Sequence, residues 1–127
     1  MTDAMMDGIT TLGRTVSGLS STNFHYRRGP HSKTGTRCVW FGVSQNADRD
    51  SVSKMYEDVV QFDFYSTNAA TLKTLAAAFD AIFDLGNLTV TGYDVILIEL
   101  TTEDPLSYED NEWRITLEYR ITTTIAR

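Results

Sequence analysis

Apolar and polar residues alternate along residues 59–66, which read V-V-Q-F-D-F-Y-S. Every second position there carries a large apolar side chain, namely Val60, Phe62 and Phe64, and the positions between them are more polar. Alternation with a period of two is typical of a strand with one buried face. We therefore predict a half-buried strand that contributes one face to a core.

The pattern changes to a helical spacing directly after this strand. Ser66, Thr67 and Asn68 can each cap a helix N-terminus, and Gly86 can end the helix. The apolar residues between them recur three or four positions apart and are Leu72, Leu75, Ala76, Phe79, Ile82 and Phe83. This spacing predicts one principal amphipathic helix over residues 68–85 that packs on a sheet.

Further strands are predicted on both sides of this unit. Residues 24–26 are a short strand candidate, and residues 38–43 form a strand that makes a hairpin with residues 55–66 across a polar turn at 45–53. Residues 95–101 read V-I-L-I-E-L-T and are apolar enough for an interior strand.

The last part of the chain combines an acidic segment with a long alternating one. Residues 103–112 are expected to form an acidic loop that contains Pro105. Residues 113–125 alternate between large apolar and polar side chains, which predicts a long strand with one dry and one wet face. Trp40, Phe41, Trp113 and Tyr119 are expected in the core, with a subunit interface as the alternative.

These elements predict an α+β fold. It is a mostly antiparallel sheet of about five strands with one principal amphipathic helix, residues 68–85, packed on it. A short N-terminal helix is a further option over residues 1–12, with Asp3 as its cap, although Gly8 and Gly13 weaken it. The 127 residues have room for one domain, residues 1–127, in which 1–22 are a candidate flexible N-terminal segment.

Charge and cysteine content narrow the function classes. The formal net charge is −6, divided as +1 for residues 1–60 and −7 for residues 61–127, so the chain has no general attraction for nucleic acid. Cys38 is the only cysteine, which favours a reducing cytoplasm and excludes an internal disulfide. No run approaches the roughly 20 apolar residues that span a bilayer, so we expect a soluble protein without a membrane partner.

No reaction centre is visible in the sequence. His25 and His31 are the only histidines, no G-x-S-x-G surrounds a serine, and Cys38 begins an apolar strand where a buried thiol is ordinary. Zinc-type spacings and glycine-rich phosphate motifs do not occur. We therefore predict a protein that is not an enzyme, with no cofactor and no metal site. A weak surface contact of the acidic residues 103–110 with Ca²⁺ is the one alternative.

Opposite charges gather in two segments. Residues 24–37 hold four cations and no acid, and residues 99–112 hold six acids and no base. Three interpretations stay open: ordinary solvated loops, complementary patches that join neighbouring copies head to tail, and a cationic loop that meets DNA or another acidic partner. A head-to-tail contact that closes makes a ring. The candidate contact residues are Arg27, Arg28, Lys33 and Arg37 against Glu103, Asp104, Glu109 and Asp110.

The order of these elements resembles a known family. The run F-D-F-Y-S at 62–66, the single helix, G-Y-D at 92–94, the acidic segment and the closing W-R-I-T-L-E-Y-R-I-T-T at 113–123 are similar to the tail terminator and tail completion proteins, also called head-tail joining proteins, of long-tailed bacteriophages. The resemblance covers residues 37–124.

This resemblance implies a structural role. Such proteins form a homo-oligomeric ring, commonly of six copies, which caps the completed tail tube and offers the attachment surface for the head or neck. The implied partners are other copies, a tail-tube protein and a head-completion or neck protein, with DNA contact at most through the ring lumen. The implied location is the virion tail or neck, and the host cytoplasm during assembly. Alternatives are a head-closure, neck or tail-tube subunit of similar fold, and a small ligand-binding α+β domain.

Overall fold

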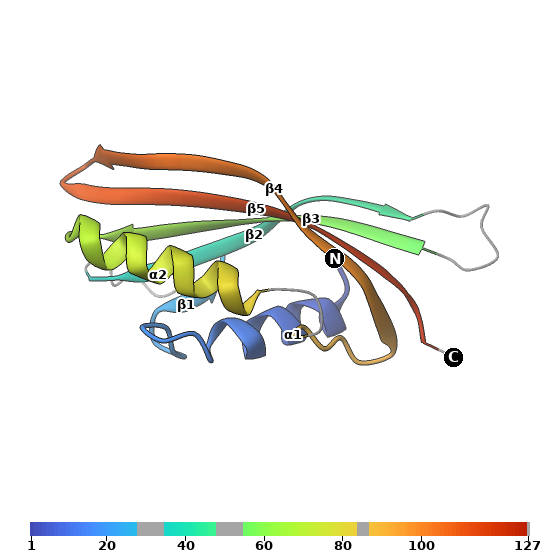
Figure 1. Cartoon of the computed structure of the whole chain (residues 1–127). Coiled ribbons are helices and arrows are strands. Elements are labelled where there is room, and N and C mark those ends of the chain that lie inside the picture. The colour runs from blue at the N-terminus through green and yellow to red at the C-terminus, as the bar shows by residue number, and fades with distance from the viewer. Residues whose placement is uncertain (28–34, 48–54, 84–86, 127) are drawn as a thin grey trace.

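The computed structural model describes residues 1–27, 35–47, 55–83 and 87–126 (Figure 1). It confirms the predicted α+β fold, with helices and a five-stranded, mostly antiparallel sheet. The elements in chain order are α1 (Asp3–Gly13), β1 (Phe24–Tyr26), β2 (Arg37–Ala47), β3 (Met55–Ser66), α2 (Ala69–Ile82), β4 (Tyr93–Glu109) and β5 (Glu112–Ile125).

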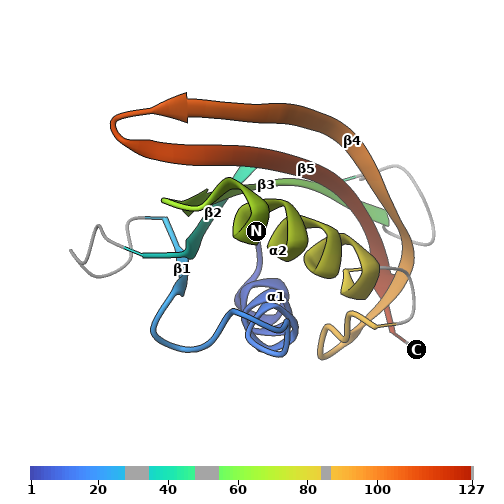
Figure 2. The same cartoon turned by 60° about the vertical axis from the view of Figure 1, so that its left-hand side comes forward.

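The strands lie in the order β1-β2-β3-β5-β4. β1 runs parallel to β2, and the other three neighbouring pairs are antiparallel. The β2–β3 hairpin is therefore confirmed, and β5 returns between β3 and β4. Figures 1 and 2 show a long, twisted sheet with both helices on one side of it. One sheet face is thus covered by helices, and the strand β4 lies at one edge.

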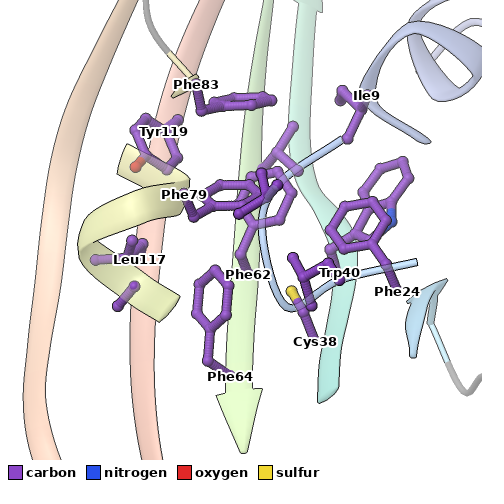
Figure 3. Packing of buried hydrophobic residues seen from close by; sticks show 14 of the residues in the cluster. Ile9, Phe24, Cys38, Trp40, Phe62, Phe64, Phe79, Phe83, Leu117 and Tyr119 are labelled. Atoms are coloured by element: carbon purple, nitrogen blue, oxygen red, sulfur yellow. The ribbon is translucent and has the colours of Figure 1, made fainter. Parts of the chain in front are cut away.

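Aromatic side chains fill the space between the sheet and the helices (Figure 3). Phe62 lies near their centre, with ring-centroid distances of 4.7 Å to Phe79, 5.2 Å to Phe83 and 5.8 Å to Tyr119. Trp40 stacks on the other side of Phe62 at 5.9 Å. Offset and edge-on aromatic pairs each add about 0.5–1.5 kcal/mol beyond the burial of their area. The alternation that predicted β3 thus selects the side chains that form this core.

Helix α2 follows the prediction closely. Asn68 is its N-cap, and the Asn68 side chain accepts a hydrogen bond of 3.0 Å from the Thr71 amide. The helix ends at Ile82, earlier than the predicted residue 85, and Phe83 is its C-cap. The predicted stop, Gly86, lies outside the described residues.

Helix α1 is capped by Thr2, so the prediction of Asp3 as the cap is wrong. The Thr2 hydroxyl accepts a 3.2 Å hydrogen bond from the Met5 amide, and Asp3 lies in the first turn, where its charge favours the positive helix end. Helical Gly residues lower helix propensity, yet Gly8 has a packing reason. A Cβ atom at Gly8 would collide with the Thr89 carbonyl oxygen, so the absence of a side chain allows α1 to approach the 87–91 connection.

The segment between α1 and β1 packs on the core. Val16 and Leu19 are buried, and the Asn23 side chain accepts a 2.7 Å bond from the Ser20 amide and donates bonds of 2.8 and 3.1 Å to the Gly18 and Thr36 carbonyls. That residues 1–127 form a single domain, and that residues 1–22 are flexible, both stay predictions.

The predicted acidic loop over residues 103–112 is wrong, because these residues belong to a β-hairpin. β4 continues to Glu109, and β5 begins at Glu112. The two turn residues between them, Asp110 and Asn111, have φ angles of 53° and 65°. Asp and Asn tolerate this left-handed region and favour tight hairpin turns. Pro105 fits in β4 because the strand is at the sheet edge and its register shifts between Asp104 and Ser107.

Two further strand predictions need correction. Residues 95–101 were expected in an interior strand, but they belong to β4, which pairs only with β5 among the described strands. The polar turn predicted at 45–53 begins later, because β2 continues to Ala47, and residues 48–54 lie outside the described part of the chain. β3 and β5 lie where the alternation predicts them, and β1 coincides with the short strand candidate at residues 24–26.

Candidate assembly surface

Arg37, one of the predicted cationic contacts, is engaged within its own chain. Its guanidinium donates two hydrogen bonds to the Glu112 carboxylate, of 2.6 and 2.9 Å, and lies 4.6 Å from the Tyr65 ring centroid. The hydrogen bond from Arg37 lowers the pKa of Glu112, and the same bond raises the pKa of Arg37. This bidentate pair therefore uses the Arg37 charge to tie β2 to β5 across the end of β3.

Arg27 is the other predicted cation that the structure describes. It follows β1 directly, has a φ angle of 59°, and its amide donates a hydrogen bond of 2.6 Å to the Trp40 carbonyl. The exposed guanidinium lies 5.1 Å from the Tyr26 ring centroid. Arg28 and Lys33 lie outside the described residues, so their predicted contacts stay predictions.

The four predicted acidic contacts lie together on the distal half of the β4–β5 hairpin. Glu103, Asp104 and Glu109 are in β4, and Asp110 is in the turn. All four are exposed, and within the described residues none forms a salt bridge. The structure thus places them in an exposed acidic row at one edge of the sheet. Within one copy it does not bring them to Arg27 or Arg37.

Glu112 is the charged partner that the sequence reasoning missed. It belongs to the acidic run that was recognised, but it was not among the four selected acids. The strand register places Arg37 opposite Tyr65 and Tyr65 opposite Arg114, so the start of β5 faces the start of β2 across the end of β3. The distribution of charges along the sequence does not predict that β3 lies between β2 and β5. The Arg37–Glu112 ion pair can therefore be recognised only from the folded structure.

A second charged group lies on the sheet face opposite the helices. Arg120 Nη1 donates a 3.4 Å hydrogen bond to Glu99, and Arg120 Nε lies 3.3 Å from Glu57 Oε1 without hydrogen-bond geometry. The three side chains are more than a third exposed, so each ion pair contributes at most about 1 kcal/mol. They connect β3, β5 and β4 on this face.

Two polar side chains in the interior are satisfied by partners from other elements. Thr116 donates a 2.6 Å hydrogen bond to the Asp63 carboxylate, and the Tyr119 hydroxyl donates a 2.7 Å bond to Asp80 on α2. Burial, followed by the bond to Asp80, raises the pKa of Tyr119 far above its usual range, so the phenol stays protonated. The Tyr119 bond joins α2 to the sheet, and the Thr116 bond joins β5 to β3.

The edge strand β4 also exposes large apolar side chains. Ile96, Leu97, Leu100 and Tyr108 are 48%, 43%, 41% and 56% exposed. Residues 95–101, whose apolar character predicted an interior strand, therefore have several of their side chains on the surface. A long edge strand leaves one row of backbone amides and carbonyls without a strand partner, and such an edge readily pairs with another chain.

A groove of about 330 Å³ lies between α2 and β4. Ile115 and Leu117 of β5 form its floor, and its other lining residues are Lys73, Ala76, Ala77, Asp80, Leu100 and Glu103. Another groove of about 440 Å³ lies between α1 and residues 87–91, and four of its nine lining residues are threonines. The first groove adjoins the exposed apolar part of β4 at Leu100. Its charged lining residues are the acids Asp80 and Glu103 and the base Lys73.

The residues that were considered for catalysis lie in ordinary structural positions. Cys38 is fully buried in the core, and burial raises the pKa of its thiol, which disfavours the nucleophilic thiolate. His25 lies 2.9 Å from the Thr22 carbonyl through its Nε2 atom, and His31 lies outside the described residues. In the described ranges no three His, Cys, Asp or Glu side chains cluster as metal ligands would. No described helix is long and apolar enough to cross a membrane.

Comparison with solved structures shows the same fold in other chains. A chain from the virion of a native gene transfer agent particle matches with a TM-score of 0.64 and 14% identity, over 88% of this chain and 84% of its own length. A second solved protein matches with a TM-score of 0.66 and 12% identity, over 98% of this chain and 93% of its own. No family model and no curated protein matches the chain. At these identities the likeness concerns the fold alone.

Proposed function

We propose that this chain is a structural protein of a bacteriophage or related particle, of the tail terminator or tail completion kind. It assembles into a ring that caps the completed tail tube and provides the attachment surface for the head or neck. The observation that carries the proposal is the shared fold with a chain of a gene transfer agent virion over 88% of this chain. The resemblance of residues 37–124 to tail terminator proteins supports the same assignment.

The surface of the fold suits an assembly role. The sheet has β1 at one edge and β4 at the other, and β4 exposes both apolar side chains and acids that form no ion pair among the described residues. Contacts between two different surfaces of identical copies are heterologous, and they form a ring if the rotation closes. The role is structural, and its chemistry is recognition between protein surfaces, without a catalytic step, cofactor or metal.

The proposed partners follow from the position of such a ring. One face of the ring meets the tail-tube protein, and the other meets a head-completion or neck protein. DNA passes through the lumen and makes at most a local contact, because the chain carries a net charge of −6. The ring belongs to the tail or neck of the virion and is assembled in the host cytoplasm.

The test is deletion of the gene from the genome that encodes the particle, followed by electron microscopy of the lysate. The proposal predicts filled heads beside unattached tails, with joining restored by the wild-type gene supplied in trans. A complete absence of tail tubes would instead indicate a tube subunit. Normal particles that lack this chain by mass spectrometry would contradict the proposal.

A further inference from the structure

We propose that β4 is the docking edge for a second copy of this chain, through main-chain pairing of residues 97–100 with the outer edge of β2 in the neighbouring copy. The inference rests on the proposed function, because it specifies the contact between subunits of the ring. Its support comes from the two edges of the sheet, their exposed side chains and their charges.

The first edge is the apolar part of β4. Its register against β5 shifts between Val95 and Leu97, between Leu100 and Thr102, and between Asp104 and Ser107. Residues 97–100 are therefore the uninterrupted run that also carries exposed leucines. Bulges and proline elsewhere in β4 hinder strand addition, whereas this run keeps a regular backbone. The groove beside Leu100, floored by Ile115 and Leu117, leaves space for an apolar side chain of the added strand.

Charge disfavours pairing of β4 with another β4. An antiparallel β4–β4 contact would bring its exposed acids, among them Glu103 and Asp104, close to their equivalents in the other copy. Like charges placed opposite each other across strands are destabilising. The acidic edge therefore selects a partner edge that is neutral or cationic, and the contact becomes head to tail.

The second edge, on β2, meets this requirement. β1 pairs with Cys38, Val39 and Trp40 of β2 and ends at Tyr26, and Arg27 directly after it has a positive φ. Along the remainder of β2, the structure describes no strand on the outer side. The register of β2 against β3 shifts between Gly42 and Ser44, so Val43 lies at an irregularity and residues 44–47 are the regular part of this edge. Val43 is 49% exposed, and the exposed Arg27 guanidinium lies at the start of the portion beyond β1.

The two edges are thus complementary in three respects. Both offer backbone groups without a strand partner among the described residues, both expose aliphatic side chains, and the β2 edge carries the exposed cation Arg27 whereas the β4 edge carries exposed acids. Addition of a strand to a sheet edge takes its affinity from main-chain hydrogen bonds, and side chains set its register. Repetition of the same contact around an axis closes a ring in which the sheets of neighbouring copies are joined edge to edge.

Cross-linking between two single variants tests this contact. Leu97→Cys and Val43→Cys are made separately, each on an exposed position, and Cys38 stays buried and unreactive. A disulfide needs Cα atoms about 4.4–6.8 Å apart. Under mild oxidation, the mixture of the two variants is expected to form several-fold more covalent dimer than either variant alone.

The matched control is Leu97→Cys mixed with Met55→Cys, because Met55 is also exposed but belongs to β3, whose partner on that side is β5. This mixture is not expected to form more dimer than either of its variants alone.

The outcomes separate this inference from the proposed function. Equal cross-linking by Leu97→Cys alone would indicate a symmetric β4 contact and overturn the inference. Absence of the mixed dimer, with rings still seen by electron microscopy of the wild type, would overturn the docking edge and leave the ring function standing. If the mixed dimer forms but deletion of the gene leaves head–tail joining intact, the contact between copies is supported and the proposed function is overturned.

Discussion

Arg37 and Glu112 form a bidentate ion pair although 75 residues separate them in the chain. The pair bridges β2 and β5 across the end of β3, next to the Tyr65 ring. Both side chains are mostly buried, at 16% and 17% exposure, so the pair is better shielded from solvent than the Arg120 pairs. It ties the tip of the β4–β5 hairpin to the start of β2.

Glu112→Gln is expected to lower the free energy of unfolding by about 1–2 kcal/mol at neutral pH, because a charge-assisted bond is lost. Arg37 holds the pKa of Glu112 below its usual value of 4.5, so the wild type keeps this contribution above that pH and loses it as pH falls through the folded-state pKa. Urea unfolding from pH 7 into the acid range should show a shallower pH dependence for the variant.

Glu109→Gln is the control for this pair, because Glu109 is exposed and has no ion pair among the described residues. Its stability should stay close to that of the wild type at neutral pH. Equal losses in Glu109→Gln and Glu112→Gln would mean that Arg37 contributes nothing specific through Glu112.

Gly8→Ala is expected to destabilise the protein by about 1–3 kcal/mol, since the added methyl group would collide with the Thr89 carbonyl oxygen. The higher helix propensity of alanine offsets only about 0.5–1 kcal/mol of this loss. Gly42→Ala is the control, because its Cβ would meet only the end of the flexible Met1 side chain. Thermal unfolding should rank Gly8→Ala clearly below Gly42→Ala, and the opposite order would refute the close approach of α1.

Tyr119→Phe removes the hydrogen bond to Asp80 and should cost about 0.5–1.5 kcal/mol of stability. The cost stays modest because Asp80 is exposed and can bind water in place of the phenol. Tyr108→Phe serves as the control, since Tyr108 is 56% exposed. Denaturant titration of both variants measures the difference, and a loss for Tyr108→Phe as large as that for Tyr119→Phe would argue against the Asp80 bond as the cause.

Phe62→Ala should cost about 3–5 kcal/mol, because it leaves a cavity where several aromatic rings meet. Phe41→Ala on the same sheet should cost less, since Phe41 is only half-buried. Guanidinium unfolding of the two variants tests this difference. If both lose the same free energy, Phe62 is not the centre of the core.

The elements that local periodicity defines could be predicted, because side-chain alternation and helical spacing depend only on neighbouring residues. β3, β5 and α2 are of this kind. The place of β4 at the edge could not be predicted, because an apolar run such as 95–101 reads the same whether its second face is covered or exposed. Strand order is set by pairing over long sequence distances, and it decides this exposure.

The candidate surface was predicted in part. Charge segregation identified the acidic residues, but their segment was interpreted as a loop, whereas the structure places it in β4 and a tight turn for which Asp110 and Asn111 are typical. The internal use of Arg37 could not be foreseen, because it depends on β5 lying beside β3. The exposed apolar side chains Leu97 and Leu100 could not be predicted either, because their exposure depends on the position of β4 at the sheet edge.

The most direct measurement for the assembly role is the mass of the purified protein by light scattering over a range of protein and salt concentrations, with electron micrographs of the largest species. The account predicts a discrete ring whose formation is slowed by salt, because charged edges guide the encounter more than they hold the contact. Stacked tubes would indicate a tube subunit. A monomer at every concentration would contradict spontaneous closure of a ring through the edges of the sheet.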